Sequence, residues 1–246
     1  MNILDEIVLS KQSEVDHSFN HKKLRMNTVL QDLRKNSFLV FGEIKPKSPS
    51  AGVLRESVNP QKITQEFESI GCAGISVLTD KKYFGGSREL FSQVRKTTAL
   101  PLLRKDFIVH TTQISQTADM NADLILFIVR ILSHEQLEFF VRQSLDYFLI
   151  PLIEIHTKVE LTTALEVIKK LNCQSRVILA VNNRNLDTFE TSLEISTALK
   201  NHIPRDVLSM SLSGIKKQSD LELLQNIGFN GVLIGEGLVN SSNLVL

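Results

Sequence analysis

The sequence predicts an α/β protein, a (β/α)8 or TIM barrel with an N-terminal helical extension. Eight short apolar runs alternate with segments of helical spacing at intervals of roughly thirty residues. Unbroken short apolar runs are typical of parallel strands that are buried on both faces. Eight strand–helix units close into a barrel of about 250 residues, and the chain has 246. The alternative is an open doubly wound sheet, but no early strand is followed by the Gly-x-Gly-x-x-Gly turn typical of such sheets.

Residues 1–36 form the extension in this prediction, and residues 37–246 form one barrel domain. Apolar side chains from Ile3 onward recur with helical spacing, so we expect a first helix that ends near Phe19. The polar stretch after it contains a second, shorter helix around Val29 and Leu33.

The barrel strands are predicted, in chain order, at residues 37–41, 74–80, 101–106, 122–129, 148–156, 177–183, 207–212 and 231–235. Apolar positions with helical spacing predict the intervening helices in segments 63–70, 87–94, 112–118, 133–141, 157–171, 193–199 and 221–227.

Several of these helices have recognisable ends. Ser87 has the residue type that caps a helix start, and Ser133–Gln136 and Thr157–Glu160 match the capping-box pattern. Gly71 and Gly228 follow the last apolar positions of their helices, where glycine readily adopts the left-handed conformation.

The composition excludes several classes of protein. A net charge of +1 without a long basic run gives no case for a nucleic-acid partner. No apolar run approaches the roughly 18 residues of a membrane helix, and the N-terminus lacks the pattern of a secretory signal. Cys72 and Cys173 are the two cysteines, so we expect no disulfide framework and a cytoplasmic location.

Polar side chains follow the predicted strands, at the end where a (β/α)8 barrel carries its active site. Glu43 and Lys45 lie two residues apart after the first strand, so both point to the same side. Other polar groups follow the third, fifth and sixth strands. The resulting set combines a cationic funnel of Lys45, Lys47, Lys105 and Arg184 with two carboxylates, Glu43 and Glu154. Such a set fits an anionic substrate whose reaction needs both an acid and a base.

The ends of the seventh and eighth strands are small and suited to phosphate. Ser213 and Gly214 follow the seventh strand, and Gly235, Glu236 and Gly237 follow the eighth. Loops at these two positions commonly bind phosphate through backbone N–H groups. We therefore expect a phosphorylated ligand there.

Longer motifs contain these residues: Glu43-Ile44-Lys45 with Lys47-Ser48-Pro49-Ser50, Val77-Leu78-Thr79-Asp80 with Tyr83-Phe84, Leu103-Arg104-Lys105-Asp106-Phe107, Leu152-Ile153-Glu154-Ile155-His156, Asn182-Asn183-Arg184-Asn185-Leu186 and Leu233-Ile234-Gly235-Glu236. In this order, over nearly the whole chain, they resemble the indole-3-glycerol phosphate synthase family.

The resemblance implies a lyase of tryptophan biosynthesis. Its reaction is ring closure, decarboxylation and dehydration of 1-(2-carboxyphenylamino)-1-deoxyribulose 5-phosphate to indole-3-glycerol phosphate. The resemblance implies no metal and no organic cofactor. The expected partner is a small anionic phosphosugar, with neither nucleic acid nor membrane, and we expect a monomer.

The resemblance also implies roles for individual residues. Lys105 matches the general acid, a role that suits a lysine if burial and neighbouring cations bring its pKa toward neutrality. Glu154 matches the base, Glu43 and Lys45 assist proton transfer and bind the sugar-phosphate end, and Asn182 orients the substrate. The remaining implied contacts are substrate binding by Lys47, Ser48, Pro49, Phe84, Phe107, Arg184 and Leu186, and phosphate binding by Lys45, Ser213, Gly214, Gly235 and Glu236.

One position departs from the family pattern. Leu212 stands where the family has a glutamate at the end of the seventh strand. The departure leaves open a diverged, non-catalytic barrel that binds phosphate ligands or serves as an interaction protein. Retention of the other catalytic positions favours an active synthase.

Two further alternatives are weaker. A related phosphosugar enzyme such as phosphoribosylanthranilate isomerase would need a cysteine or aspartate acid–base pair at the strand ends, and we cannot place one. His17 and His21 are spaced i, i+4 on the first helix, but they lack a third ligand for a metal.

Overall fold

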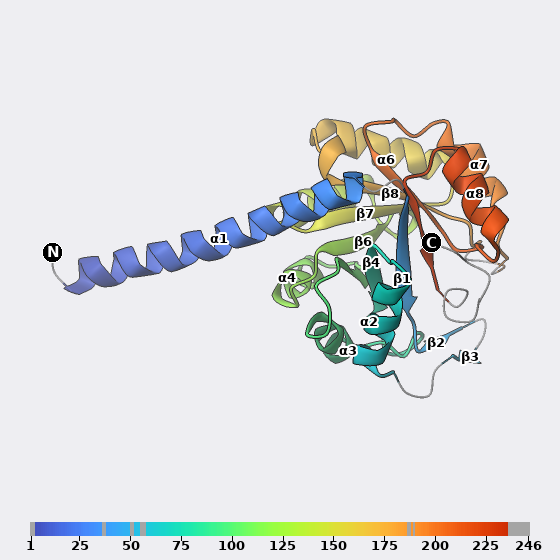
Figure 1. The fold of residues 1–246 in the computed structure, drawn as a ribbon. Coiled ribbons are helices and arrows are strands. Elements are labelled where there is room, and N and C mark those ends of the chain that lie inside the picture. Colours follow the sequence, from blue (N-terminus) through green and yellow to red (C-terminus); the bar gives the residue numbers. More distant parts are fainter. Residues whose placement is uncertain are drawn as a thin grey trace.

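Eight parallel strands close into a barrel in the computed structural model, which describes residues 3–35, 38–49, 52–54, 58–185, 188 and 190–235. Around the barrel the strand order is β1, β10, β9, β8, β7, β6, β5, β4, and β1 pairs with β4 to close it. The barrel strands are β1 (Leu39–Ile44), β4 (Gly74–Leu78), β5 (Leu102–Lys105), β6 (Leu124–Ile128), β7 (Ile150–Ile155), β8 (Ile178–Asn182), β9 (Leu208–Leu212) and β10 (Gly231–Ile234). The predicted fold class is confirmed (Figure 1).

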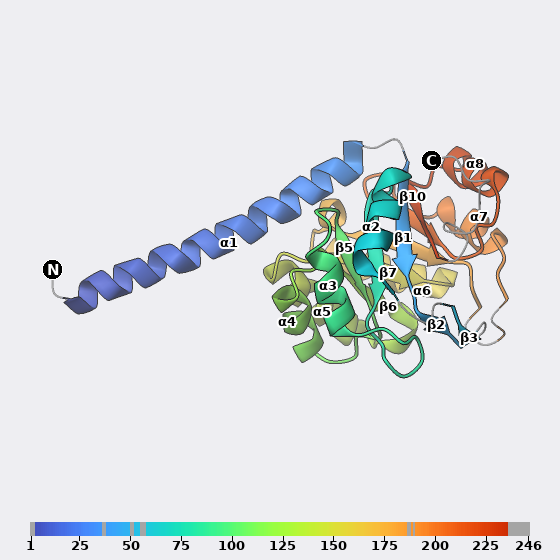
Figure 2. The ribbon, with the colours of Figure 1, turned by 60° about the horizontal axis from the view of Figure 1, so that its bottom comes forward.

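Helices cover the outside of the barrel (Figures 1 and 2). They are α2 (Pro60–Ser69), α3 (Arg88–Arg95), α4 (Thr112–Asp119), α5 (His134–Asp146), α6 (Lys158–Lys170), α7 (Glu194–Lys200) and α8 (Gln218–Asn226). Two short 3-10 turns, Val129–Ile131 and Gln174–Arg176, and a small antiparallel pair, β2 (Lys47–Ser48) with β3 (Gly52–Val53), complete the connections. The sequence patterns did not indicate the β2–β3 pair.

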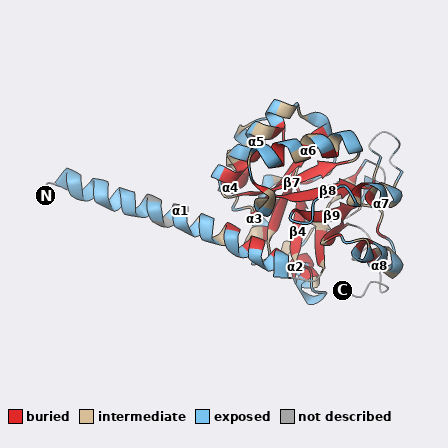
Figure 3. Ribbon diagram, turned by 90° about the horizontal axis from the view of Figure 1, so that it is seen from above, coloured by how far each residue is buried: buried red, intermediate tan, exposed pale blue. Residues whose placement is uncertain are grey.

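Strand alternation divides the buried side chains into two sets. Ile75 and Val77 of β4 point outward into the layer shared with the helices. Leu39 and Phe41 of β1 belong to the separate cluster that fills the barrel. Figure 3 shows buried strands surrounded by helices that are exposed on their outer faces. Because inward positions recur every second residue, the next inward position of β1 after Phe41 is Glu43.

Most of the predicted helix ends are confirmed. Ser87 caps α3 by accepting from Leu90 N at 3.0 Å, and Ser133 with Gln136 forms the expected capping box. Gly71 and Gly228 have φ of 82° and 94°.

The capping box that begins at Thr157 is only half formed. Thr157 accepts from Glu160 N at 3.2 Å. The Glu160 carboxylate instead accepts from His156 N, one residue before the cap, at 2.6 Å.

The prediction of two helices in the extension is wrong, because residues 3–35 form one helix, α1 (Ile3–Lys35). No glycine or proline interrupts this stretch, so local sequence offers no break. Its last turns bury Met26, Val29, Leu30 and Leu33 against the barrel interior. The N-terminal half projects away from the barrel (Figures 1 and 2).

An ion-pair cluster anchors α1 at the end of the barrel where the strands begin. Asp123, just before β6, is buried and accepts from Arg25 Nε at 2.5 Å and from Arg95 Nη1 at 2.9 Å. It also accepts from the backbone N–H of Leu102 at 2.9 Å. The helix therefore does not cover the opposite end of the barrel, where the strands end.

No helix among the described residues combines the length and apolar character required to cross a membrane.

Candidate active site

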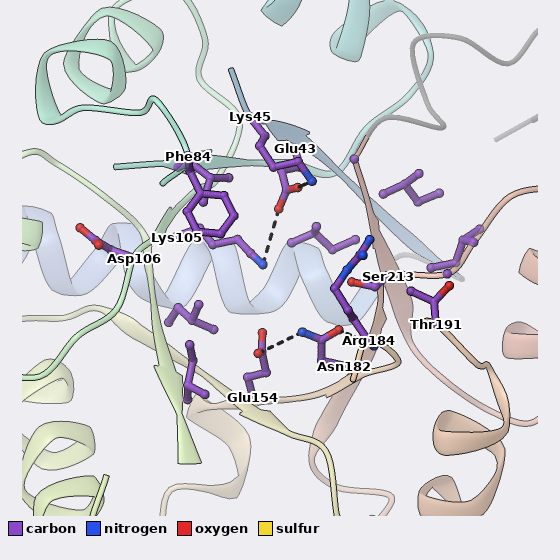
Figure 4. A pocket seen from close by; sticks show the side chains of 18 of the residues that line it. Glu43, Lys45, Phe84, Lys105, Asp106, Glu154, Asn182, Arg184, Thr191 and Ser213 are labelled. Carbon is purple, nitrogen blue, oxygen red and sulfur yellow. Dashed lines mark hydrogen bonds and ion pairs between the residues drawn. The ribbon is translucent and has the colours of Figure 1, made fainter. Parts of the chain in front are cut away.

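A cavity of about 390 Å³ opens where the strands end, within the usual size range of small-molecule sites. Its lining includes eleven residues that the sequence predicted: Glu43, Lys45, Phe84, Lys105, Phe107, Glu154, Asn182, Arg184, Ser213, Gly214 and Gly235. They come from the ends of β1, β5, β7 and β8, from the residues directly after these strands, and from the loops after β4, β9 and β10 (Figure 4). The fold therefore brings together residues that lie far apart in the chain.

Glu43 is held between two ammonium groups. Its Oε1 lies 3.0 Å from Lys45 Nζ, and its Oε2 lies 3.5 Å from Lys105 Nζ. The Glu43 side chain is 6% exposed, and those of Lys45 and Lys105 are 16% and 18% exposed. A carboxylate shared by two cations at this depth fixes the position of both.

The charges in this cluster determine the protonation states of Glu43 and Lys105. Burial alone would raise the pKa of Glu43, but the ammonium groups of Lys105 and Lys45 outweigh it and hold that pKa below its ordinary value. Burial also tends to lower the pKa of Lys105, yet the carboxylates of Glu43 and Glu154 raise it above its ordinary value. The condition that burial and neighbouring cations bring the pKa of Lys105 toward neutrality is therefore not met, because the carboxylates raise this pKa and Arg184 contributes less. Lys105 is an ammonium at neutral pH.

Glu154 and Asn182 form a second polar pair in the cavity. Glu154 is the last inward position of β7, and Asn182 Nδ2 donates to its Oε1 at 3.1 Å. Asn182 Oδ1 accepts from the backbone N–H of Arg184 at 3.0 Å, which fixes the amide orientation. The other carboxylate oxygen of Glu154 is buried without a hydrogen-bond partner. A buried, unpartnered acceptor at a cavity wall is suited to receive a proton from a ligand.

The loop after β9 turns sharply at the two positions predicted to bind phosphate. Ser213 and Gly214 have φ of 65° and 82°, both in the left-handed region. Asn183, which is fully buried, supports this turn by donating to Ser211 Oγ at 2.8 Å and to Ser213 O at 3.1 Å. These hydrogen bonds hold the turn in one conformation, so it presents a fixed surface to the cavity.

Gly235 lies against the Glu43–Lys45 pair at the end of β10. A Cβ at Gly235 would stand 3.0 Å from Glu43 Oε1 and 3.6 Å from Lys45 Nζ. Glycine therefore lets the backbone approach this ion pair closely.

Phe84 and Phe107 form an aromatic side of the cavity. Their ring centroids are 6.0 Å apart, and the rings are inclined by 33°. Asp80 holds the first loop by accepting from Tyr83 N at 2.6 Å and from Phe84 N at 3.1 Å. Such a surface suits a planar aromatic group.

Some predicted positions are not brought to the cavity in this structure. Lys47 points elsewhere, since its Nζ donates to Lys82 O at 2.5 Å. Ser48 and Pro49 are also absent from the lining residues, so the proposed contacts of these three remain predictions. Leu186 and Glu236 lie outside the described residues.

Other lining residues were missed by the sequence analysis. Lys216 adds a cation two positions after Gly214, and the signal was the lysine pair that follows the predicted phosphate loop. Asp106 also lines the cavity, where Arg104 Nη2 and Thr79 Oγ1 donate to it at 3.0 Å and 2.6 Å. Arg104 is buried on the outward side of β5, where its Nη1 donates to Gln113 O and Thr117 Oγ1 of α4. It therefore orients Asp106 and does not join the cationic funnel.

Leu212 points into the barrel below the cavity. It is 1% exposed and belongs to the interior cluster. Its strand neighbours are Asn182 on β8 and Leu233 on β10. An apolar residue thus occupies the position beside Asn182 where the resemblance implies a carboxylate.

Metal ligation has little support among the residues that the structure describes. No group of three or more His, Cys, Asp and Glu side chains within them is placed to hold a metal ion. The side chain of His17, which the sequence paired with His21, lies outside the description.

Comparisons with known proteins match almost the whole chain. A family model described as indole-3-glycerol phosphate synthase matches residues 4–245. A protein of that name from Prochlorococcus marinus (strain AS9601) is 38% identical over 261 residues, which covers 99% of this chain and 86% of the relative. Namesakes from Alkaliphilus metalliredigens and Lachnoclostridium phytofermentans are 37% and 41% identical, covering 85% and 82% of this chain and 78% and 72% of the relatives.

One solved structure supports the fold alone. The structure titled "Native KDPGal structure" has a TM-score of 0.55 and a sequence identity of 15%, and the match covers 84% of this chain and 86% of the chain in that structure.

Proposed function

We propose roles for the polar and aromatic cavity residues discussed below from the premise that this chain belongs to the indole-3-glycerol phosphate synthase family. The family's reaction converts a carboxyphenylamino-deoxyribulose phosphate into indole-3-glycerol phosphate with loss of carbon dioxide and water. The chain is a carbon–carbon lyase of tryptophan biosynthesis.

Lys105 acts as the general acid of ring closure in this proposal. When the ring carbon attacks the substrate ketone, the ketone oxygen gains charge and needs a proton. The carboxylates of Glu43 and Glu154 keep the pKa of Lys105 raised against the effect of burial, so a proton is available at neutral pH. Glu43 also holds the ammonium in place from 3.5 Å.

Glu154 acts as the base of dehydration. Aromatisation of the new ring requires loss of the proton on its nitrogen while the hydroxyl leaves as water. The unpartnered carboxylate oxygen of Glu154 supports this role, and the hydrogen bond from Asn182 holds the other oxygen in position. Lys105, reprotonated from solvent after ring closure, supplies the proton to the departing hydroxyl.

The remaining cavity residues bind the substrate. Arg184 meets the aromatic carboxylate, a group that guanidinium recognises in forked geometry. Lys45, Lys216 and the turn at Ser213 line the same cavity, and this combination of two cations with backbone N–H groups suits the phosphate. Phe84 and Phe107 flank the aromatic ring. Holding the two reacting carbons together contributes several kcal/mol of the lowered barrier, on the order seen for oriented reactions.

The observation that carries the proposal is the convergence on one cavity, from two strands, of the Lys105 ammonium and the Glu154 carboxylate, which has one unpartnered oxygen. Purified protein should convert the carboxyphenylamino-deoxyribulose phosphate to a fluorescent indole product. Lys105→Ala should lower kcat by at least about a hundredfold, as expected for loss of a general acid. Lys170→Ala, at an exposed lysine of α6, is the matched control. Equal rates for Lys105→Ala and wild type would refute the role of Lys105.

The setting of the enzyme is part of the proposal. We infer a phosphosugar-binding monomer in the cytoplasm. Its two cysteines support a reducing compartment, since Cys72 and Cys173 are free and buried. Burial raises the pKa of these thiols to about 12 and about 11, which makes them unreactive.

A further inference from the structure

A histidine that the proposed mechanism does not use lies directly behind Glu154. His156 follows β7, and its Nε2 is 3.6 Å from Glu154 Oε1. On its other side, Nδ1 is 3.3 Å from Glu160 Oε2, near the start of α6. The His156 side chain is only 8% exposed. The imidazole therefore stands between two carboxylates, one at the cavity and one outside it.

The contacts of Glu160 determine which ring nitrogen carries a proton. Glu160 accepts from His156 N at 2.6 Å, so its carboxylate is fixed beside the ring. Burial tends to raise the pKa of Glu160, but hydrogen bonds from the His156 ring and backbone hold it below its ordinary value. An ionised Glu160 accepts from Nδ1–H, because a carboxylate offers only acceptors. In the neutral ring Nε2 is then a bare acceptor that faces Glu154.

His156 Nε2 and the Glu154 carboxylate form a site for one proton. Nε2 is buried without a hydrogen-bond partner and faces Glu154 Oε1 at 3.6 Å, and the other carboxylate oxygen, Oε2, is also buried without a partner. A proton on Nε2 would give the ring a positive charge between two carboxylates. The other charges that act here are Arg130, before α5, on Glu160, and Lys105 on Glu154.

We propose that His156 is the positioning partner of Glu154 and accepts through Nε2 the proton that Glu154 removes from the substrate. The inference rests on the proposed role of Glu154 as base. The substrate N–H bond breaks as its proton binds the Glu154 carboxylate. The proton then moves to Nε2, so the carboxylate is restored and His156 becomes an imidazolium between Glu154 and Glu160. Release of this proton to solvent, together with reprotonation of Lys105 from solvent, completes the turnover.

His156→Asn is the decisive variant. Its amide can still donate to Glu160 in place of Nδ1–H, but it lacks Nε2. We expect kcat to fall by roughly tenfold to a hundredfold with KM changed by less than about twofold. The acid limb of the kcat/KM profile should move to lower pH by about one unit or more, because a carboxyl alone then accepts the proton. Glu160→Gln should move it in the same direction by less.

His134→Asn is the matched control, since His134 faces Glu166 at the same 3.6 Å on the exposed surface of α5 and α6. It should leave both kcat and the pH profile unchanged. A loss of kcat in His156→Asn with an unmoved acid limb would mean a merely structural role and overturn the proposal.

A readout that needs no turnover keeps the inference testable. In ring-nitrogen NMR titrations, Glu154→Gln should lower the pH at which His156 gains its proton, because the imidazolium loses one neighbouring carboxylate. An unmoved midpoint would overturn the proposal even if His156→Asn fails to fold. If Glu154→Gln converts substrate at the wild-type rate, both the proposed role of Glu154 as base and the inference about His156 fail. If it is inactive while the His156→Asn acid limb stays in place, only the inference about His156 fails.

Discussion

Replacing Glu43 by glutamine tests the electrostatic balance of the site. The carboxylate of Glu43 is shared by Lys45 and Lys105, and it is the largest influence that raises the pKa of Lys105. Glu43→Gln keeps the shape of the side chain and removes its charge. The pKa of Lys105 should then fall, since burial and the charge of Arg184 remain while the carboxylate that raises it most is gone.

The size of the effect follows from the distance. Two unit charges 3.5 Å apart interact by about 5 kcal/mol at an effective dielectric constant of about 20. Lys105 is 18% exposed, so solvent screening reduces this figure. One pH unit corresponds to about 1.4 kcal/mol. If about a third of the interaction remains, the alkaline limb of the kcat profile should move to lower pH by about one unit.

The assay is the fluorescence of the indole product, followed across pH for wild type and variant. Glu138→Gln is the control, because Glu138 on α5 is also shared by two cations, Arg142 and Lys170, but does not line the cavity. It should leave the alkaline limb in place. An alkaline limb that stays fixed in Glu43→Gln would show that the protonated form of Lys105 does not govern the rate.

Two further predictions concern stability and the departure from the family pattern. Asp123→Asn should lower the free energy of unfolding by about 3 to 5 kcal/mol, because it leaves the guanidinium of Arg95 buried without its carboxylate. Arg25→Ala should lower the free energy of unfolding by only about 1 kcal/mol, because the Arg25 side chain is 39% exposed. Urea unfolding measures both variants, and equal losses of free energy would contradict this reasoning. Leu212→Glu should lower the free energy of unfolding by about 3 kcal/mol, because it buries a carboxylate in an apolar cluster. A faster turnover despite that cost would identify Leu212 as a lesion, and an unchanged or lower rate would mean that the site has adapted to leucine.

Much of the fold and part of the site could be predicted from local patterns. Strand periodicity put Glu43 and Lys45 on one side of β1, and the structure brings the two within 3.0 Å. The sequence also indicated that Lys105, Glu154 and Asn182 share one end of the barrel, because parallel strands all end on the same face. These conclusions needed only the order of residues along each strand.

Other features depend on distances between segments that no local pattern contains. The packing of the C-terminal part of α1 is one case. The residues that surround Leu33 and the carboxylate that pairs with Arg25 both belong to the barrel. The orientation of Lys47 is another, because its ammonium binds a carbonyl of the next loop.

The chain order by itself determined a (β/α)8 barrel and the residue types at its open end. Only the tertiary structure decided their protonation and pairing. Burial and Coulomb interaction act on the pKa of Lys105 in opposite directions, and the sign of the result depends on the distances to Glu43 and Glu154. In the same way, His156 gains a role only because the start of α6 brings Glu160 to its far side.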